Sequence, residues 1–272
     1  MMENKEFYLR DDGINIHVKL DLPDVSAAGA EDRLPLLILI HGFTGNMEEN
    51  HLLAVKQAAL ESGFAVLRAE MYGHGMSGGA FRDHTLYKWI SNAMTVIDYA
   101  RGLDFVSGLY LAGHSQGGLL TILIGAMEKD RLKAILPLSP ALKIPVDARS
   151  GNVLGMPFDP DRIPEQVEDG EGLVLGGNYI RIAQMIDAEA AIRRYKGPVL
   201  IVHGSADETI PVQYSIDAAG QYADARLVVV PDDTHCYDLH PDMLADAVRD
   251  FLQSLHHPGS GSQQMCPVSE PK

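Results

Sequence analysis

The chain has 272 residues, of which 46% are hydrophobic and 22% are charged, and its formal net charge is −15. Such a composition is typical of a globular protein with one or two domains, and it excludes collagen-like, disordered and disulfide-scaffold proteins. The acidic balance argues against nucleic acid as a partner, because phosphate contacts need clustered Lys and Arg side chains.

The first elements that the sequence predicts are two extended segments within residues 5–22, joined at Asp12-Gly13, a dipeptide typical of a hairpin turn. Short, uniformly apolar runs follow, which is the pattern of parallel strands covered on both faces. Amphipathic stretches of helical period separate most of these runs, so the sequence predicts an α/β fold with a doubly wound, mostly parallel sheet. The runs are 34–40, 64–69, 109–112, 134–138, 199–202 and 227–230, and the helical stretches are 49–62, 85–101, 117–129, 212–222 and 241–255.

The alternation of strands and helices fails between Pro140 and Lys196, a stretch rich in Pro and Gly that carries one helical pattern from about Tyr179 to Ala191. Ordinary connections have a median length of roughly 4–6 residues, so this segment is far too long to be one. We therefore expect a lid, residues 141–195, inserted between the sixth strand and the following core strand. Residues 1–140 and 196–255 are expected to form the core, and residues 256–272 a disordered tail.

The sequence also bears on location. Two cysteines, Cys236 and Cys266, cannot form a disulfide framework, and this count fits a reducing compartment. Residues 1–10 contain no signal-type apolar segment, and no apolar run reaches the roughly 18 residues that a membrane span needs. We expect a cytoplasmic protein that does not partner a membrane.

The strongest motif is Gly113-His114-Ser115-Gln116-Gly117, which lies between an apolar run and a helical stretch. A strand-to-helix turn of this kind exposes the serine hydroxyl above the sheet, and side chains at the two glycine positions would collide with neighbouring backbone. The following helix contributes N–H groups suited to a developing oxyanion. A helix-capping serine is the alternative, but the strand–turn–helix context predicts that Ser115 is a nucleophile.

A nucleophilic serine needs a base and an orienting carboxylate, which in this topology follow in the order Ser, Asp, His. Asp207 and His235 each come shortly after an apolar run, so both are expected at the sheet edge where Ser115 lies. Asp232 and Asp233 are rival acids that resemble turn residues. A metal site built on His235 with its neighbours Cys236, Asp238 and His240 matches no zinc spacing, so we predict no metal.

Two glycine-rich segments remain. His41-Gly42-Phe43-Thr44-Gly45 follows the first parallel run, where a turn would bring the N–H of Phe43, together with that of Gln116, to the oxyanion. Gly73-His74-Gly75-Met76-Ser77-Gly78 matches a dinucleotide fingerprint, yet it follows the wrong strand and no helix begins directly after it. The sequence therefore predicts no nicotinamide or flavin, and no cofactor of any other kind.

Together with Met71-Tyr72-Gly73-His74-Gly75 and Asp233-Thr234-His235-Cys236-Tyr237, these motifs resemble the α/β-hydrolase superfamily. More narrowly, the chain is similar to bacterial cinnamoyl (feruloyl) esterases over residues 5–255, including the stretches 83–89 and 178–184. In that family the insertion covers the nucleophile and holds the aromatic acyl group. The resemblance implies that Tyr179 and Asp147 contact the ring hydroxyl of the substrate, although helix packing for Tyr179 and a turn or cap for Asp147 remain alternatives.

The resulting hypothesis is a serine carboxylesterase that hydrolyses feruloyl, caffeoyl or p-coumaroyl esters through an acyl-enzyme. Its partner would be a small aromatic ester, and a homodimer is compatible with the sequence. A general short-acyl esterase or lysophospholipase-like hydrolase would use the same machinery. A ligand-binding receptor with a vestigial triad is the alternative from outside the enzymes.

Overall fold

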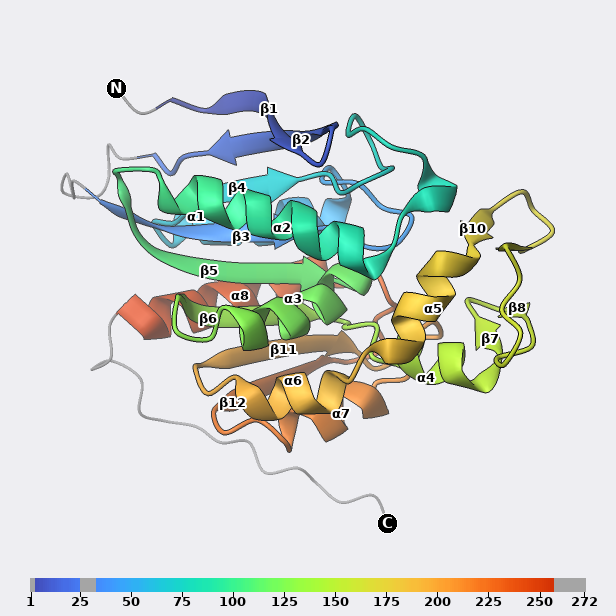
Figure 1. Cartoon of the computed structure of the whole chain (residues 1–272). Coiled ribbons are helices and arrows are strands. Elements are labelled where there is room, and N and C mark those ends of the chain that lie inside the picture. Colours follow the sequence, from blue (N-terminus) through green and yellow to red (C-terminus); the bar gives the residue numbers. More distant parts are fainter. Residues whose placement is uncertain (1–2, 25–32, 257–272) are drawn as a thin grey trace, which may run out of the picture.

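A computed structural model of the chain describes residues 3–24 and 33–256. Its centre is an eight-stranded sheet with the order β1-β2-β4-β3-β5-β6-β11-β12. Figure 1 shows this sheet from β1 at the top to β12 at the bottom. β1 is antiparallel to β2 and β2 to β4, whereas all later neighbours are parallel. The strands are β1 (Lys5–Asp11), β2 (Ile14–Asp21), β3 (Leu34–Ile40), β4 (Ala65–Ala69), β5 (Val106–His114), β6 (Leu132–Leu138), β11 (Val199–Gly204) and β12 (Ala225–Val230).

Helices cover both faces of this sheet because its central strands are apolar on both sides; every residue of β3 is buried. Two separate apolar clusters result. The first joins the sheet to α2, α3, α7 and α6 (Ala188–Arg194), and the second joins it to α1 and α8. The helices of the core are α1 (Asn50–Glu61), α2 (Leu86–Arg101), α3 (Gln116–Met127), α7 (Gln213–Ala219) and α8 (Pro241–His256), with a short 3₁₀ turn, η1 (Phe81–Asp83).

This arrangement confirms the predicted doubly wound sheet and its inserted segment between the sixth strand, β6, and the next core strand, β11. The N-terminal hairpin is confirmed as well. Asp12 and Gly13 both have positive φ, 43° and 83°, which is the conformation that a two-residue hairpin turn of this twist requires.

The insertion has more regular structure than the sequence indicated. It begins with α4 (Lys143–Ser150), continues through the small hairpins β7 (Asn152–Val153) with β8 (Met156–Pro157) and β9 (Gln166–Glu168) with β10 (Val174–Gly176), and ends in two helices. The predicted single helix from Tyr179 to Ala191 is wrong. α5 (Gly177–Met185) ends at Ile186, whose backbone is extended. α6 (Ala188–Arg194) then begins with Asp187 as its N-cap, and the Asp187 carboxylate accepts a hydrogen bond from the N–H of Ala190 at 2.9 Å.

Apolar side chains of the lid join the first cluster of the core rather than forming one of their own. Val153, Leu175 and Ile180 are fully buried there. Of the predicted tail, His256 ends α8, and residues 257–272 lie outside the described residues. Within residues 3–24 and 33–256, no helix has both the length and the apolarity to cross a membrane.

Candidate active site

Ser115 occupies a sharp turn between β5 and α3. Its backbone has φ 54° and ψ −115°, a conformation that costs a non-glycine residue about 1–3 kcal/mol and that persists only where the surroundings enforce it. The N–H of Ser115 donates to the carbonyl of Leu138, and the Ser115 carbonyl accepts from the N–H groups of Leu119 and Ala141. The strained turn is therefore fixed on both sides, with the serine at the carboxyl edge of the sheet.

Glycine is required on each side of this turn because backbone lies against it. A Cβ atom at Gly113 would stand 2.3 Å from the carbonyl oxygen of Gly117, and a Cβ at Gly117 would stand 2.5 Å from that of His41. A Cβ at Gly42 would lie 3.3 Å from the Cβ of Ser115. The loop after β3 thus passes directly beside the serine.

Asp207 and His235 are brought together from the loops after β11 and β12. His235 Nδ1 lies 2.6 Å from Asp207 Oδ2. The other ring nitrogen of His235, Nε2, has no hydrogen-bond partner within the described ranges, and its side chain keeps 15% exposure. The sequence prediction that these two residues meet at one edge of the sheet agrees with this geometry; their chemical roles stay a prediction.

The Asp207 carboxylate is held by four donors. Oδ1 accepts from the N–H groups of Thr209 (2.9 Å) and Ile210 (2.8 Å), and Oδ2 is approached by His203 Nε2 at 3.0 Å as well as by His235. Burial raises the pKa of Asp207, but the hydrogen bonds from His203 and His235 outweigh it and hold this pKa well below its usual range. Asp207 therefore remains an anion beside His235.

Sequence reasoning missed His203, which is fully buried at the end of β11 and bonded to Ser215 Oγ through its other nitrogen. A histidine directly after a buried strand and four residues before the predicted acid was the available signal. It also missed His114. Burial lowers the pKa of His114 well below its usual value, so the ring is neutral, and its Nε2 donates to the carbonyl of His235 at 2.8 Å. This bond ties the His235 loop to the serine turn.

Asp233, one of the rival acids, has a structural task. Its carboxylate is fully buried and accepts from the N–H groups of Thr234, Leu239 and His240 at 2.8, 3.1 and 3.0 Å. It folds the loop that carries His235. Asp238, suggested for a metal site, accepts from the Thr234 hydroxyl at 2.7 Å. No cluster of three or more His, Cys, Asp or Glu within residues 3–24 and 33–256 is arranged to hold a metal ion.

The two amides predicted to bind an oxyanion, those of Phe43 and Gln116, flank Ser115. Gln116 is the first residue of α3, and Phe43 follows the glycine that touches the serine. Neither N–H donates a hydrogen bond to any residue that the structure describes. Neither amide therefore has an intramolecular hydrogen bond to give up within the described chain.

Tyr179, on α5, reaches down to the serine turn. Its hydroxyl donates to Gln116 Oε1 at 2.7 Å, and its ring packs against Phe43 and His84 with centroids 5.7 and 5.1 Å away. The side chain is fully buried, which raises the pKa of Tyr179 and keeps the phenol protonated. Gln116 Nε2 is buried with no hydrogen-bond partner in the described chain, so one donor of this carboxamide is unused.

Asp147, the other residue predicted to contact substrate, lies on α4 and forms an ion pair with Lys143 one turn earlier. Its carboxylate is 17% exposed. No hydrogen bond within the described residues joins Asp147 to Tyr179, so the structure does not bring the two together directly.

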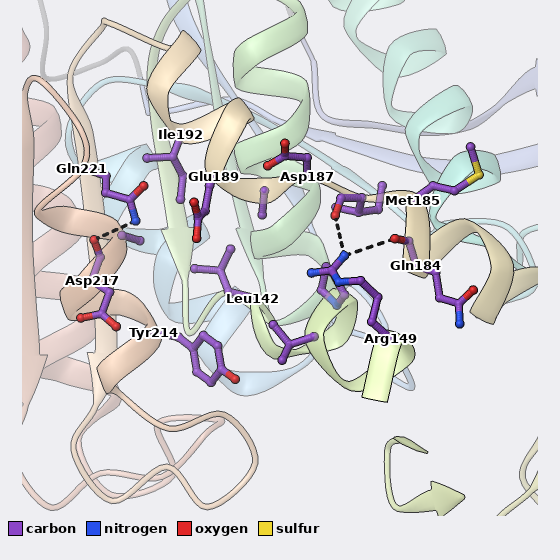
Figure 2. A pocket seen from close by; sticks show the side chains of 15 residues that line it. Leu142, Arg149, Gln184, Met185, Asp187, Glu189, Ile192, Tyr214, Asp217 and Gln221 are labelled. Atoms are coloured by element: carbon purple, nitrogen blue, oxygen red, sulfur yellow. Dashed lines mark hydrogen bonds between the residues drawn. The ribbon is translucent and has the colours of Figure 1, made fainter. Parts of the chain in front are cut away.

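Two cavities border the lid. One of about 480 Å³ lies where α4, the junction of α5 and α6, and α7 meet. Figure 2 shows Arg149 on one side of it, bonded to the carbonyls of Gln184 and Ile186, and Asp217 and Gln221 on the other side. The other, of about 410 Å³, lies between the starts of α2 and α5 and is lined by Tyr179 and His84. Neither Ser115 nor His235 lines either cavity.

The loop with the apparent dinucleotide fingerprint, residues 73–78, packs around the side chain of Glu70. Met76 N–H donates to Glu70 Oε2 at 2.6 Å, and a Cβ at Gly75 would stand 2.0 Å from the Glu70 carboxyl carbon. His17 Nδ1 contacts the same carboxylate at 2.8 Å. Gly75 thus makes room for Glu70.

Known proteins resemble this chain over most of its length. The sequence model described as the alpha/beta hydrolase family matches residues 37–247. The structure of Est1E from Butyrivibrio proteoclasticus with ferulic acid bound is 48% identical, with a TM-score of 0.88, and covers 92% of this chain and 99% of that one. A second Est1E structure is 46% identical, with a TM-score of 0.85, and covers 92% of this chain and 98% of that one.

More distant relatives match in sequence. The bovine mitochondrial palmitoyl-protein thioesterase ABHD10 is 23% identical over 225 residues, which is 77% of this chain and 69% of the relative. The protein YfhR of Escherichia coli K12, described as uncharacterized, is 25% identical over 243 residues, or 86% of this chain and 75% of its own.

Proposed function

Since the chain belongs to the α/β-hydrolase family and is an esterase of that superfamily, we propose that it is a serine carboxylesterase. Its substrates would be hydroxycinnamate esters such as feruloyl, caffeoyl and p-coumaroyl esters. The observation that carries the proposal is the hydrogen-bonded pair Asp207–His235 at the edge of the sheet where the strained Ser115 turn lies. Likeness to a protein whose structure holds ferulic acid supports the acyl group.

In the proposed reaction His235 is the general base. Its Nδ1 faces the Asp207 anion, so the ring proton lies on Nδ1 and Nε2 carries the lone pair. Nε2 takes the proton of the Ser115 hydroxyl as its oxygen attacks the ester carbonyl. The imidazolium then protonates the departing alcohol, and a water molecule attacks the acyl-enzyme by the same route to release the acid.

The N–H groups of Phe43 and Gln116 receive the negative charge of the tetrahedral intermediates. Both are free of intramolecular partners in the described chain, so binding the oxyanion breaks no existing hydrogen bond. Loss of one such donor costs about 3 kcal/mol of transition-state stabilisation in related chemistry. The steps are acid–base and nucleophilic, and the residues on the sheet edge suffice for them without a cofactor.

An aromatic wall beside the serine supports an aromatic acyl group. Phe43 packs edge to face with Tyr179, and His84 packs at a tilt against both rings. The cinnamoyl ring would extend along these three rings under the lid. We propose that the phenol of the substrate meets Tyr179, whose hydroxyl oxygen has a free lone pair, and that Asp147 approaches it from α4.

The decisive test is Ser115→Ala assayed with methyl ferulate. We expect hydrolysis to fall by at least about 10⁴-fold while the circular dichroism spectrum and melting temperature are preserved. Hydrolysis at the wild-type rate by the folded variant would refute the serine mechanism.

The substrate class is tested separately, by a panel of methyl ferulate, caffeate and p-coumarate against p-nitrophenyl butyrate. A higher kcat/KM for the butyrate would indicate a general short-acyl esterase instead. Ligand binding without release of acid would indicate a receptor with an inactive triad. Neither result is expected for an intact Asp207–His235 pair beside an aromatic wall.

Tyr179→Phe removes the proposed phenol contact and keeps the ring. We expect its kcat/KM to fall several-fold more for p-coumarate than for unsubstituted methyl cinnamate, because only the former has the 4-hydroxyl. Equal losses would show that Tyr179 acts only through its bond to Gln116.

A further inference from the structure

His41 is a fully buried histidine that bridges two backbone groups beside the serine. Its Nε2 lies 3.0 Å from the N–H of Met71, and its Nδ1 lies 2.7 Å from the carbonyl oxygen of Gly42. From the sequence, His41 is expected at the start of the oxyanion turn, and no pattern predicts a task for its side chain.

The two partners fix the tautomer of this ring. The Met71 amide can only donate, so Nε2 must accept; the Gly42 carbonyl can only accept, so Nδ1 must carry the hydrogen. Burial lowers the pKa of His41 to about 3, with the neighbouring His74 a smaller contribution in the same direction, so the ring stays neutral. A neutral ring of one defined tautomer is the only form that satisfies both contacts.

The Gly42 carbonyl and the Phe43 N–H belong to the same peptide unit. In a trans peptide these groups point in opposite directions, so a bond that holds the carbonyl also aims the N–H. A hydrogen bond to the carbonyl also polarises the amide and strengthens its N–H as a donor, because linked hydrogen bonds are cooperative. We propose that His41 is a positioning residue that orients and strengthens the Phe43 donor of the oxyanion hole.

The inference rests on the proposed serine mechanism. It defines one chain of hydrogen bonds, from Met71 N–H through the imidazole and the 42–43 peptide to the oxyanion. The ring has little freedom to leave this position, since it packs against Trp89 and His74 with centroids 4.8 and 5.1 Å away. His74 in turn contacts the carbonyl of Phe43 through its Nε2, and Gly45 N–H adds a longer bond of 3.2 Å to Gly42.

Two substitutions separate the two ends of the imidazole. His41→Asn places an amide near the Nδ1 position and keeps a donor for Gly42. His41→Gln places its amide near the Nε2 position, keeping an acceptor for Met71 while it loses the bond to Gly42. We expect His41→Gln to lose at least tenfold in kcat with KM changed less than twofold, and His41→Asn to retain a clearly larger share of kcat. His17→Gln, which removes a buried histidine of β2 that contacts Glu70, serves as a control for destabilisation alone.

Affinity for phenylboronic acid reports the oxyanion hole directly, because its serine adduct is tetrahedral and anionic. For His41→Gln we expect this affinity to fall by the same factor as kcat/KM. Equal losses in the Asn and Gln variants, or a loss confined to KM, would overturn the proposal. Absence of ester hydrolysis by the wild-type protein would instead refute the proposed function itself.

A measurement on the unsubstituted protein covers the case in which a variant does not fold. Long-range ¹H–¹⁵N NMR spectra distinguish the two neutral tautomers of a histidine. We expect the Nδ1–H form for His41 from pH 5 to 8. The Nε2–H form, or titration within this range, would overturn the proposal.

Discussion

Asp207→Asn replaces one oxygen atom, Oδ2, which both His235 and His203 approach. The asparagine carbonyl keeps the hydrogen bonds from Thr209 and Ile210, while its NH₂ group takes the place of Oδ2. That group is a donor, and it would face His235 Nδ1, now 2.6 Å from the carboxylate. The imidazole must then offer its lone pair at Nδ1 and carry its proton on Nε2, where it no longer acts as a base for Ser115.

Loss of the correct tautomer in a serine triad lowers kcat by about 10⁴-fold, which is about 5 kcal/mol of barrier. We expect a fall of this size in kcat for methyl ferulate, measured in the steady state at pH 7. Asp232→Asn is the matched control, because this neighbouring acid is exposed and forms no side-chain hydrogen bond that the structure records. A loss of less than tenfold in the folded Asp207→Asn protein would refute the assignment of Asp207 as the orienting acid.

Three further predictions concern stability. The folded pKa of Asp207 lies below the unfolded value of about 3.9. The stability that this carboxylate contributes is therefore present above pH 4 and is lost as the pH falls through the folded pKa. In Asp207→Asn, the free energy of unfolding, followed by circular dichroism, should depend less steeply on pH in acid. Gly117→Ala places a methyl group 2.5 Å from backbone and should cost about 3 kcal/mol or prevent folding, whereas Gly220→Ala meets nothing closer than 3.7 Å and should be tolerated in urea titrations. Asp187→Ala removes the cap of α6 and should lower the free energy of unfolding by about 1 kcal/mol, more than Glu189→Ala, which loses an exposed ion pair with Arg193, with esterase activity unchanged in both.

The parallel core was predictable because its strands are apolar without interruption and its helices are amphipathic. Residues 34–40 match β3 at both ends, and the other predicted runs differ from their strands by at most three residues at either end. The apolar and amphipathic patterns do not predict the order of the strands in the sheet. It follows from pairings between distant residues, such as Leu36 with both Ala65 and Leu109.

The lid was the least predictable part because its boundaries depend on local capping. Residues 179–191 keep a helical pattern of polarity across the break at Ile186, and only the hydrogen bond from Ala190 to Asp187 shows that a new helix begins. α4 was missed because Pro145 suggested a loop, yet proline is tolerated in the first turn of a helix, where its missing N–H has no partner to lose.

For the candidate site, the strand ends located Ser115, Asp207 and His235 because side chains that follow parallel strands share one edge. Of the three supporting histidines, His203 alone had a sequence signal, its place four residues before Asp207. His41 and His114 contact backbone groups, and no pattern in a single sequence predicts those contacts.

The shared apolar cluster of lid and core has a consequence for engineering. Since Leu175 and Ile180 pack in the same interior as α2 and α3, residues 141–195 are not an exchangeable module. A chimera that borrows the lid of another hydrolase would inherit mismatched side chains beneath it and lose thermal resistance along with its original selectivity. Changes of substrate range in this scaffold are therefore best sought by paired substitutions, one on the lid and one on the helix that it touches.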